Sequence, residues 1–247
     1  MTPLAERTTD NENFEFEALK YAVNYRQAVY NEFAPFLNGD ILEVGAGIGQ
    51  MTELLQRHPT SARLRCIEPS VEFCTEHRAK FPNLELVCGT IDDLPAGTSC
   101  DAIVSINVLE HIEDDSRELT AYFDKLSRRS GHLCLLVPAR PEIYSSIDRR
   151  FGHYRRYTRR QLQTNLLAAG FTLKKLFYFN WLGYLAWGVK FRLLNQQRFG
   201  SAQVHFFDSA LFPMVNWLER KLSRPPVGQS LIAIAIASEA ASSKPLY

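Results

Sequence analysis

The sequence has almost no excess charge of either sign. Lys and Arg account for 28 of the 247 residues and Asp and Glu for 27, so the formal net charge is +1. A chain without a net field does not attract nucleic acid or an acidic surface over long distances. We therefore expect no nucleic-acid partner.

Cysteine is scarce and scattered. The five cysteines, at positions 66, 74, 88, 100 and 134, form no C-x-x-C pair and are odd in number. This pattern excludes a disulfide framework and a zinc site of the usual spacing, so we expect buried thiols in a reducing compartment and no metal. The first residues, MTPLAERTTDNENFEFE, are polar and acidic rather than signal-like, which favours a cytoplasmic protein.

Long apolar runs are also missing. The longest, LFYFNWLGYLAWGV at 176–189, is interrupted by Asn180 and is shorter than the roughly 20 residues of a transmembrane helix. Hydrophobic residues still make up 46% of the chain and charged residues 22%, which is the composition of a globular protein. We expect no transmembrane segment, although the aromatic run leaves peripheral membrane contact open.

The sequence does contain a regular alternation of strand-length apolar runs and helical patterns. Strands separated by helices form parallel sheets through right-handed crossovers, so the alternation predicts an α/β fold with a seven-stranded, mostly parallel sheet covered by helices on both faces. The predicted strands are 41–45, 63–68, 84–89, 101–107, 132–138, 172–179 and 230–237. The predicted helices are 14–37, 50–58, 70–81, 114–129 and 158–171.

A segment of about 50 residues before the last strand, 180–228, departs from this alternation. It is aromatic-rich and too long for a simple connection, which indicates a helical insertion with a role of its own. We expect a single domain over 1–247. Its parts are an N-terminal helical lid (1–37), a sheet core (38–179 and 229–238) and the insertion (180–228).

The stretch DILEVGAGIGQM, residues 40–51, joins the first predicted strand to the next helix. Glycines at 45, 47 and 49 allow a tight turn and close approach of the backbone to a ligand. Gln50 stands where a dinucleotide fingerprint requires its third glycine, and no Gly-Lys-Ser/Thr follows. Neither a pyrophosphate loop nor a P-loop is therefore indicated.

Two acids suggest what the loop binds. Glu43 lies in the first strand next to the loop and suits a cationic ligand. Glu68, at the end of the second strand, is placed to accept the hydroxyls of a ribose. A positively charged ribonucleoside without phosphates fits both, and S-adenosylmethionine is such a molecule.

Four motifs, LEVGAGIG, CIEPS, GTIDDLP and SINVLEHIED, resemble in order and spacing those of class I S-adenosylmethionine-dependent methyltransferases. The resemblance continues through FGHYRRYT and PPVGQSLIAIA, so it covers about Tyr25 to Ala237. It is greatest to a bacterial subgroup whose substrates are mostly undefined. It implies a Rossmann-like fold and S-adenosylmethionine as the methyl donor.

The resemblance also implies which residues line the cofactor site. Glu43 would lie at the methionine end, Glu68 at the ribose and Asn107 under the methionine moiety. Thr90 stands where the family usually has an acid near the adenine amino group, and Asp92 follows two residues later. The full set of expected cofactor-binding residues is Glu43, Gly45, Ala46, Gly47, Gly49, Glu68, Pro69, Thr90, Ile91, Asp92 and Asn107.

Methyl transfer is an in-line displacement that needs a base only for a poor nucleophile such as an alcohol or phenol. His153, in the polar loop DRRFGHYRRYT, is the first choice for that base, with His111 as a competitor and Tyr157 as a further polar contact. For His111, a packing role under the cofactor loop fits the sequence at least as well as a role as the base. The arginines near His153 fit a solvated surface turn as well as a binding loop. The expected substrate-binding residues are Tyr25, Tyr144, Tyr154, Arg155 and Trp181.

We therefore expect a methyltransferase that acts on an oxygen of a small or amphipathic metabolite, such as a natural product or a lipid-linked or sugar-like acceptor. A nitrogen or carbon acceptor remains open, as does a catalytically silent protein that only binds the cofactor. A nicotinamide oxidoreductase is disfavoured by Gln50 and Glu43. Either a monomer or a homodimer is compatible with the sequence.

Overall fold

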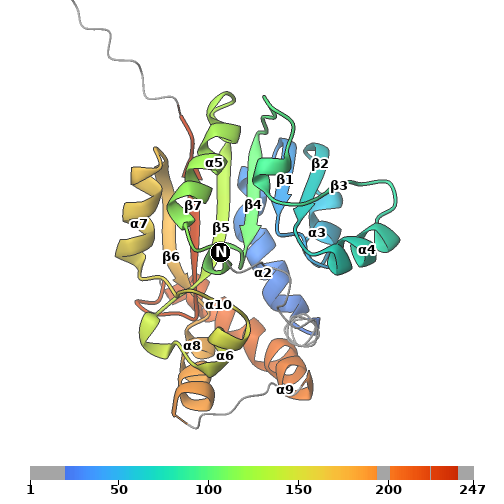
Figure 1. Cartoon of the computed structure of the whole chain (residues 1–247). Coiled ribbons are helices and arrows are strands. Elements are labelled where there is room, and N and C mark those ends of the chain that lie inside the picture. The colour runs from blue at the N-terminus through green and yellow to red at the C-terminus, as the bar shows by residue number, and fades with distance from the viewer. Residues whose placement is uncertain (1–19, 194–200, 223, 239–247) are drawn as a thin grey trace, which may run out of the picture.

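A computed structural model describes residues 20–193, 201–222 and 224–238 of the protein. One seven-stranded sheet lies at its centre, in the order β3-β2-β1-β4-β5-β7-β6 (Figure 1). All strands are parallel except β7, which runs antiparallel to both β5 and β6. The strands are β1 (Gly39–Val44), β2 (Ser61–Glu68), β3 (Glu85–Cys88), β4 (Ala102–Ile106), β5 (His132–Pro138), β6 (Thr172–Phe179) and β7 (Ser230–Ile236).

The predicted α/β fold is confirmed, and each predicted strand is present with both ends within two residues of the expected position. Strand order reverses between β1 and β4, which are neighbours in the sheet but are separated in sequence by β2 and β3. In open α/β sheets, ligands bind at the carboxyl ends of the strands beside such a reversal. The predicted glycine loop follows β1 directly and therefore lies at this position.

The helices between the strands also match the sequence pattern, with shorter lengths. They are α2 (Val23–Phe33), α3 (Thr52–Gln56), α4 (Val71–Lys80), α5 (Asp115–Ser127), α6 (Ser146–Arg150) and α7 (Arg159–Ala168). The first predicted helix, 14–37, is shorter than expected: residues 20–22 are not helical, a 3₁₀ turn occupies 34–36, and 14–19 lie outside the described residues. The short α6 was not predicted.

Two large hydrophobic clusters cover the sheet, one on each face. Alternation along β5 shows the arrangement, because Leu133, Leu135 and Val137 belong to one cluster while Cys134 and Leu136 belong to the other. The first cluster includes buried residues of α5 and α7, and the second includes residues of α2, α3 and α10 (Phe212–Leu222). A strand buried on both faces reads as a continuous apolar run, which is why HLCLLVP was recognisable from sequence.

The segment between β6 and β7 is helical where the structure describes it. It contains α8 (Trp181–Trp187), a π-helical stretch (Gly188–Leu193), α9 (Ser201–Phe206), a second π-helical stretch (Phe207–Leu211) and α10. Figure 1 shows these helices together at the lower end of the sheet. The last residue of β5, Pro138, pairs with Ser230, the first of β7, so this is the end at which the parallel strands finish.

The insertion is connected to the N-terminal helix by Asp208. Its carboxylate accepts the backbone N–H groups of Asn24 and Tyr25, each at 2.8 Å, across 184 and 183 residues of sequence. No local side chain caps the start of α2, so a residue of the insertion supplies the hydrogen bonds that the first turn lacks. This contact holds α2 and the insertion together over the edge of the sheet.

Within the described ranges, no helix combines the length and the apolar character that crossing a membrane requires. All five cysteines are free thiols, and four of them are buried.

Candidate functional site

The loop after β1 adopts a backbone that requires glycine. Gly45, Gly47 and Gly49 have φ values of 73°, 53° and 84°, in the left-handed region. A Cβ atom on Gly45 would lie 2.3 Å from Val108, and one on Gly49 would lie 2.2 Å from Phe81. The glycines therefore allow both the turn and the close packing of the loop against its neighbours.

Glu43 lies beneath this loop instead of at its surface. Its side chain is buried, accepts the Thr52 hydroxyl at 2.6 Å and contacts the Cys66 thiol at 3.6 Å. Burial raises the pKa of Glu43 to about 7, so the carboxyl is not a full anion at neutral pH. We therefore correct the expectation that Glu43 contacts the methionine end of the cofactor as a fixed negative charge; it connects β1 to α3.

Glu68 lies at the carboxyl end of β2, where the sequence placed it. One carboxylate oxygen accepts the N–H of Gly47 at 2.8 Å and the other accepts the N–H of Ser70 at 2.9 Å. These two bonds fix the orientation of the Glu68 carboxylate beside the glycine loop. The loop and the predicted ribose acceptor are thus parts of one structure.

Four further residues were expected to contact the cofactor. Asn107 follows β4 in a left-handed conformation, with φ of 52°, and lines the cavity described below. Ile91 is buried, and Ala46, which belongs to the glycine loop, is buried as well. The structure gives Pro69 no specific contact beyond its place between Glu68 and the N-cap of α4.

Thr90 and Asp92 differ from expectation. The Thr90 hydroxyl donates to Asp93 at 3.1 Å, and the two residues form a capping box around a 3₁₀ turn. Asp92 is exposed and pairs with Arg117 at 2.7 Å. Both side chains therefore stabilise local structure, and neither has a geometry that specifically supports an adenine contact.

A cavity of about 300 Å³ lies between the end of β5, the loop that follows it and the insertion. Tyr25, Asn107 and His153 line it, as the sequence predicted for ligand-contacting residues. Its remaining lining is mostly contributed by the insertion and by the ends of β5 and β7: Ala22, Glu110, Pro138, Phe151, Arg156, Asn180, Gly183, Ala186, Trp187, Lys190, Gln203, Val204, Phe207, Asp208, Gln229 and Ser230. The cavity thus has apolar aromatic walls and a small group of polar side chains.

His153 is held in a defined orientation by Asp148. The ring Nδ1 lies 3.2 Å from Asp148 Oδ1, and the backbone N–H of His153 donates to the Asp148 carbonyl at 2.9 Å. Burial pushes the pKa of Asp148 upward, but the His153 hydrogen bond and the Arg156 charge outweigh it, so the pKa lies below its usual value. In the tautomer that donates Nδ1–H to the ionised Asp148, the lone pair of His153 is on Nε2.

The loop that carries His153, Ala139–Tyr157, is bonded to the segment that follows β4. The N–H of Tyr154 donates to the Glu110 carbonyl at 2.8 Å, and Arg155 pairs with Asp115 at 3.0 Å. The hydroxyl of Tyr157 donates to Asp115 at 2.8 Å. Two loops far apart in sequence thereby form one rigid edge next to the cavity.

Three expected site residues have structural roles in this edge. Tyr157 is completely buried and its hydroxyl is used by Asp115, so the prediction of a catalytic contact at this position is wrong. Arg155 faces Asp115, and the next residue, Arg156, lines the cavity in its place. Tyr144 donates its hydroxyl to the His153 carbonyl at 2.8 Å and so supports the loop.

The other residues expected to bind the substrate lie in different surroundings. Tyr25 packs between Phe179 and Phe212, and its hydroxyl hydrogen-bonds to Ser230 at 3.0 Å. Burial raises the pKa of Tyr25 to about 12, so it stays protonated at neutral pH.

Tyr154 and Trp181 do not line the cavity. Tyr154 is exposed. Trp181 begins α8, where its N–H donates to Glu219 at 2.7 Å. The tryptophan that lines the cavity is Trp187, six residues later.

Sequence reasoning missed two residues of this region. Asp148, the first residue of the stretch DRRFGHYRRYT, was given no role, yet it is completely buried. Glu110, also completely buried, was part of a quoted motif but was given no role. His111, which the sequence analysis did name, follows Glu110 directly, and its ring lies 4.7 Å from that of His153, centroid to centroid, at an interplanar angle of 86°. For Glu110 and His111, the signal in the sequence was the tripeptide L-E-H at 109–111, after β4.

Comparison with known proteins agrees with this geometry. A family model described as a methyltransferase domain matches residues 41–131, which include the glycine loop, Glu68 and Asn107. No curated protein matches the sequence significantly.

Solved structures share the fold at low sequence identity. The plantazolicin methyltransferase BpumL in complex with S-adenosylhomocysteine has a TM-score of 0.58 and 15% identity, over 95% of this chain and 90% of its own. An S-adenosylmethionine-dependent methyltransferase from Mesorhizobium loti has a TM-score of 0.56 and 18% identity, over 85% and 97%. One from Clostridium acetobutylicum has 0.55 and 11%, over 87% and 92%.

The residues at the sheet edge fit S-adenosylmethionine. The loop of left-handed glycines presents bare backbone, Glu68 ends β2 with its carboxylate oriented, and Asn107 lies where strand order reverses. The family match covers these same residues. Residues 41–131 therefore match a methyltransferase domain, and the chain shares the fold of solved S-adenosylmethionine-dependent methyltransferases.

Proposed function

We propose that the enzyme methylates an oxygen atom of a small amphipathic acceptor that binds in the cavity beside the Ala139–Tyr157 loop. The observation that carries this proposal is the orientation of His153. Asp148 holds Nδ1, so the lone pair is on Nε2, on the side of the ring away from Asp148. His153 also lines the cavity.

The residues of the glycine loop, Glu68 and Asn107 would hold the cofactor. When bound, S-adenosylmethionine supplies a methyl group on a sulfonium. The leaving group is a neutral thioether, which needs no acid catalyst. What the chain has to provide is alignment, exclusion of water and, for a hydroxyl acceptor, a place for the proton. Asn107 lines the same cavity as His153, which supports a transfer point near this edge.

The walls of the cavity favour an acceptor with an apolar body. Trp187 and Phe151 are buried in one hydrophobic cluster with Ile143 and Ile147, and both line the cavity. Arg156 lies over the Trp187 ring at 4.6 Å and is paired with Asp148 at 2.6 Å. An acceptor with an aromatic or aliphatic body and one polar end matches apolar walls that surround a few fixed polar groups.

The polar group at the reacting end is best explained as a hydroxyl. An alcohol or phenol is a poor nucleophile until it loses its proton, whereas a neutral amine needs no such help. A buried histidine whose Nδ1 is hydrogen-bonded to an ionised aspartate is arranged to accept the proton of the hydroxyl. The arrangement would have little use for an acceptor that is already nucleophilic.

His153→Ala tests this proposal. The variant should lose methyl transfer by about 100-fold or more, because general base catalysis contributes about 10² to 10⁴. Its affinity for S-adenosylhomocysteine should stay within about twofold, since His153 is not among the residues expected to hold the cofactor. Labelled S-adenosylmethionine with a panel of phenols, alcohols and amines measures the first quantity, and calorimetry measures the second.

His132→Gln is the matched control, because His132 begins β5 at the opposite end of the sheet from the cavity. It should retain both properties. An enzyme that methylates amines but no hydroxyl compound, or a His153→Ala variant with full turnover, would contradict the proposal.

A further inference from the structure

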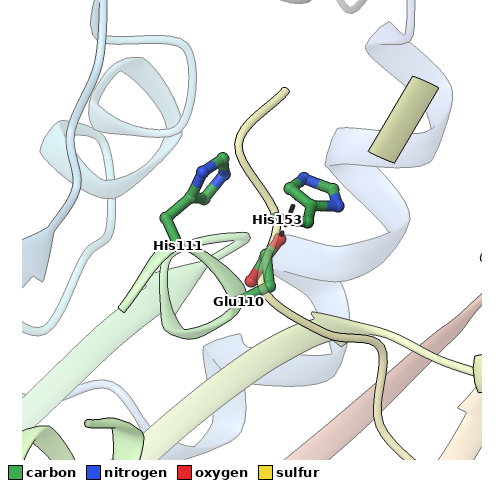
Figure 2. Close-up of side chains that lie close together, drawn as sticks. All are labelled: Glu110, His111 and His153. Atoms are coloured by element: carbon green, nitrogen blue, oxygen red, sulfur yellow. Dashed lines mark ion pairs between the residues drawn. The ribbon is translucent and has the colours of Figure 1, made fainter. Parts of the chain in front are cut away.

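Three side chains beside the cavity have the composition of a metal site. Glu110, His111 and His153 each offer one ligand atom, and these atoms all lie within 4.8 Å of one another. Figure 2 shows the two imidazole rings close together with the Glu110 carboxylate beside them. Two imidazole nitrogens and one carboxylate oxygen form the donor set that binds divalent transition ions in proteins while leaving positions open for a substrate.

The backbone fixes the distances between these side chains. Glu110 and His111 are consecutive and lie in a short 3₁₀ turn (Leu109–His111) after β4. The hydrogen bond from Tyr154 N–H to the Glu110 carbonyl joins this turn to the residue that follows His153. The three ligand atoms are therefore held near one another by the fold, although His153 is more than 40 residues away in sequence.

The burial of the site also points to a ligand. Glu110 has a fully buried side chain, and the His153 side chain is only 5% exposed. Within the described part of the chain, His153 Nε2 has no hydrogen-bond partner; the Glu110 carboxylate is 4.0 Å away, beyond hydrogen-bond reach. A buried nitrogen with nothing to bond costs free energy unless something else binds it.

Asp148 contacts the other ring nitrogen of His153, Nδ1. Histidines that bind metals almost always donate their other N–H to a carboxylate or a carbonyl, which fixes the tautomer and the direction of the ring. The Nδ1 of His153 is 3.2 Å from Asp148, and Arg156 and Ser145 hold Asp148 in turn. An outer carboxylate is thus already in place for a ligand at Nε2.

We propose that Glu110, His111 and His153 bind a divalent transition-metal ion, and that the open positions of this ion hold the acceptor hydroxyl. This inference deepens the proposed function and rests on it. The Nε2 of His153 then acts as a ligand instead of as the base. Ligand atoms bound at about 2.1 Å to one ion lie roughly 3 to 3.5 Å apart, so the side chains close inward by about 1 Å on binding.

The ion would promote deprotonation of the acceptor hydroxyl, the step otherwise assigned to the base. A divalent cation bound to a hydroxyl oxygen stabilises its anion and lowers its pKa, so the proton leaves to water at neutral pH. The oxygen keeps its electron pair and gives it to the methyl carbon, while the electrons of the breaking C–S bond remain on sulfur. Charge and atoms balance without any oxidant or reductant.

Titration of the full-length, EDTA-treated enzyme with Co²⁺ tests the inference. Co²⁺ reports its ligands in its visible spectrum, and elemental analysis of the dialysed protein gives the stoichiometry. We expect one equivalent to bind. The variants His111→Ala, His153→Ala and Glu110→Gln should each weaken binding by about tenfold or more, since even an outer partner of a ligand is worth 10- to 100-fold.

His132→Gln should bind Co²⁺ like the wild type, and the affinity of every variant for S-adenosylhomocysteine should stay within about twofold, which shows that each one is folded. Co²⁺ that binds equally well to all the variants, or that does not bind at millimolar concentration, would overturn the metal site. Turnover that still depends on His153 would then leave the oxygen-methylation proposal intact. The converse result, with Co²⁺ bound as expected but no hydroxyl methylated, would support the metal site and sink the proposed function.

Discussion

Two buried carboxyl groups, one on each side of the site, are treated by the fold in opposite ways. Glu43, under the glycine loop, has only neutral partners, the Thr52 hydroxyl and the Cys66 thiol, and burial raises its pKa to about 7. Asp148, under the Ala139–Tyr157 loop, is just as buried, yet His153 and Arg156 hold its pKa below the usual value. Burial is common to both, so the partners decide the charge.

This difference matches what each region has to do. The glycine loop needs a rigid connection between β1 and α3, and a hydrogen bond between neutral groups supplies it without a buried charge. The acceptor region needs an oriented histidine, and an ionised Asp148 fixes its tautomer. The proposed cofactor half of the site thus uses backbone shape, whereas the proposed acceptor half uses buried charge.

Asp148→Ala should have the largest effect on stability. It leaves the guanidinium of Arg156, whose side chain is 1% exposed, without its carboxylate, and removing one member of a buried ion pair typically costs about 3 to 5 kcal/mol. Denaturant unfolding measures the loss. Glu76→Ala, which breaks the exposed pair with Lys80, is the control and should leave the unfolding free energy nearly unchanged. Equal effects of the two substitutions would remove the distinction drawn here.

Glu43 should make stability depend on pH in the opposite sense to a paired acid. Because its pKa in the folded protein, about 7, lies above the usual value of 4.5, its contribution to stability is fully present below pH 4.5 and is lost as the pH rises through 7. The wild type should therefore lose roughly 2 to 3 kcal/mol between pH 5 and 8 relative to Glu43→Gln, which cannot ionise. Unfolding curves at several pH values measure this; parallel profiles for the two proteins would show that the carboxyl is charged throughout.

Gly49→Ala should weaken binding of S-adenosylhomocysteine by about tenfold or more, because the new Cβ would lie 2.2 Å from the Phe81 ring and displace the loop. Gly97→Ala is a closely matched control: its φ, 80°, is similar to the 84° of Gly49, but the nearest atom to its Cβ is 4.0 Å away. Both variants carry the left-handed strain of about 1 kcal/mol, so only the first tests the packing of the loop. Calorimetry separates the two, and equal affinities would contradict a tight loop.

The strands and the glycine loop could be predicted because their information is local. Apolar runs of strand length, such as 132–138, are read from consecutive residues, and the glycines at 45, 47 and 49 are required by their own backbone angles. The cap of α7 belongs to the same class, since the Thr158 hydroxyl accepts from the N–H of Gln161 only three residues later.

The acceptor region could be predicted only in outline. The choice between Arg155 and Arg156, or between Trp181 and Trp187, depends on the direction in which each side chain leaves the chain, and contacts with distant residues set that direction. Arg155 faces Asp115 because the two loops are bonded together, while Arg156 faces Asp148. The sequence-based list therefore named Arg155 and Trp181, whereas Arg156 and Trp187 line the cavity.

The sequence by itself determined the strands of the sheet, their burial and the shape of the glycine loop. Apolar periodicity and the backbone freedom of glycine are properties of a few consecutive residues. Tertiary structure alone decided which polar groups meet at the acceptor end. Glu110, His111 and His153 come together only because β4 and β5 are neighbours in the sheet and their following loops share a backbone hydrogen bond. Such a meeting depends on the path of the whole chain, and no local pattern encodes it.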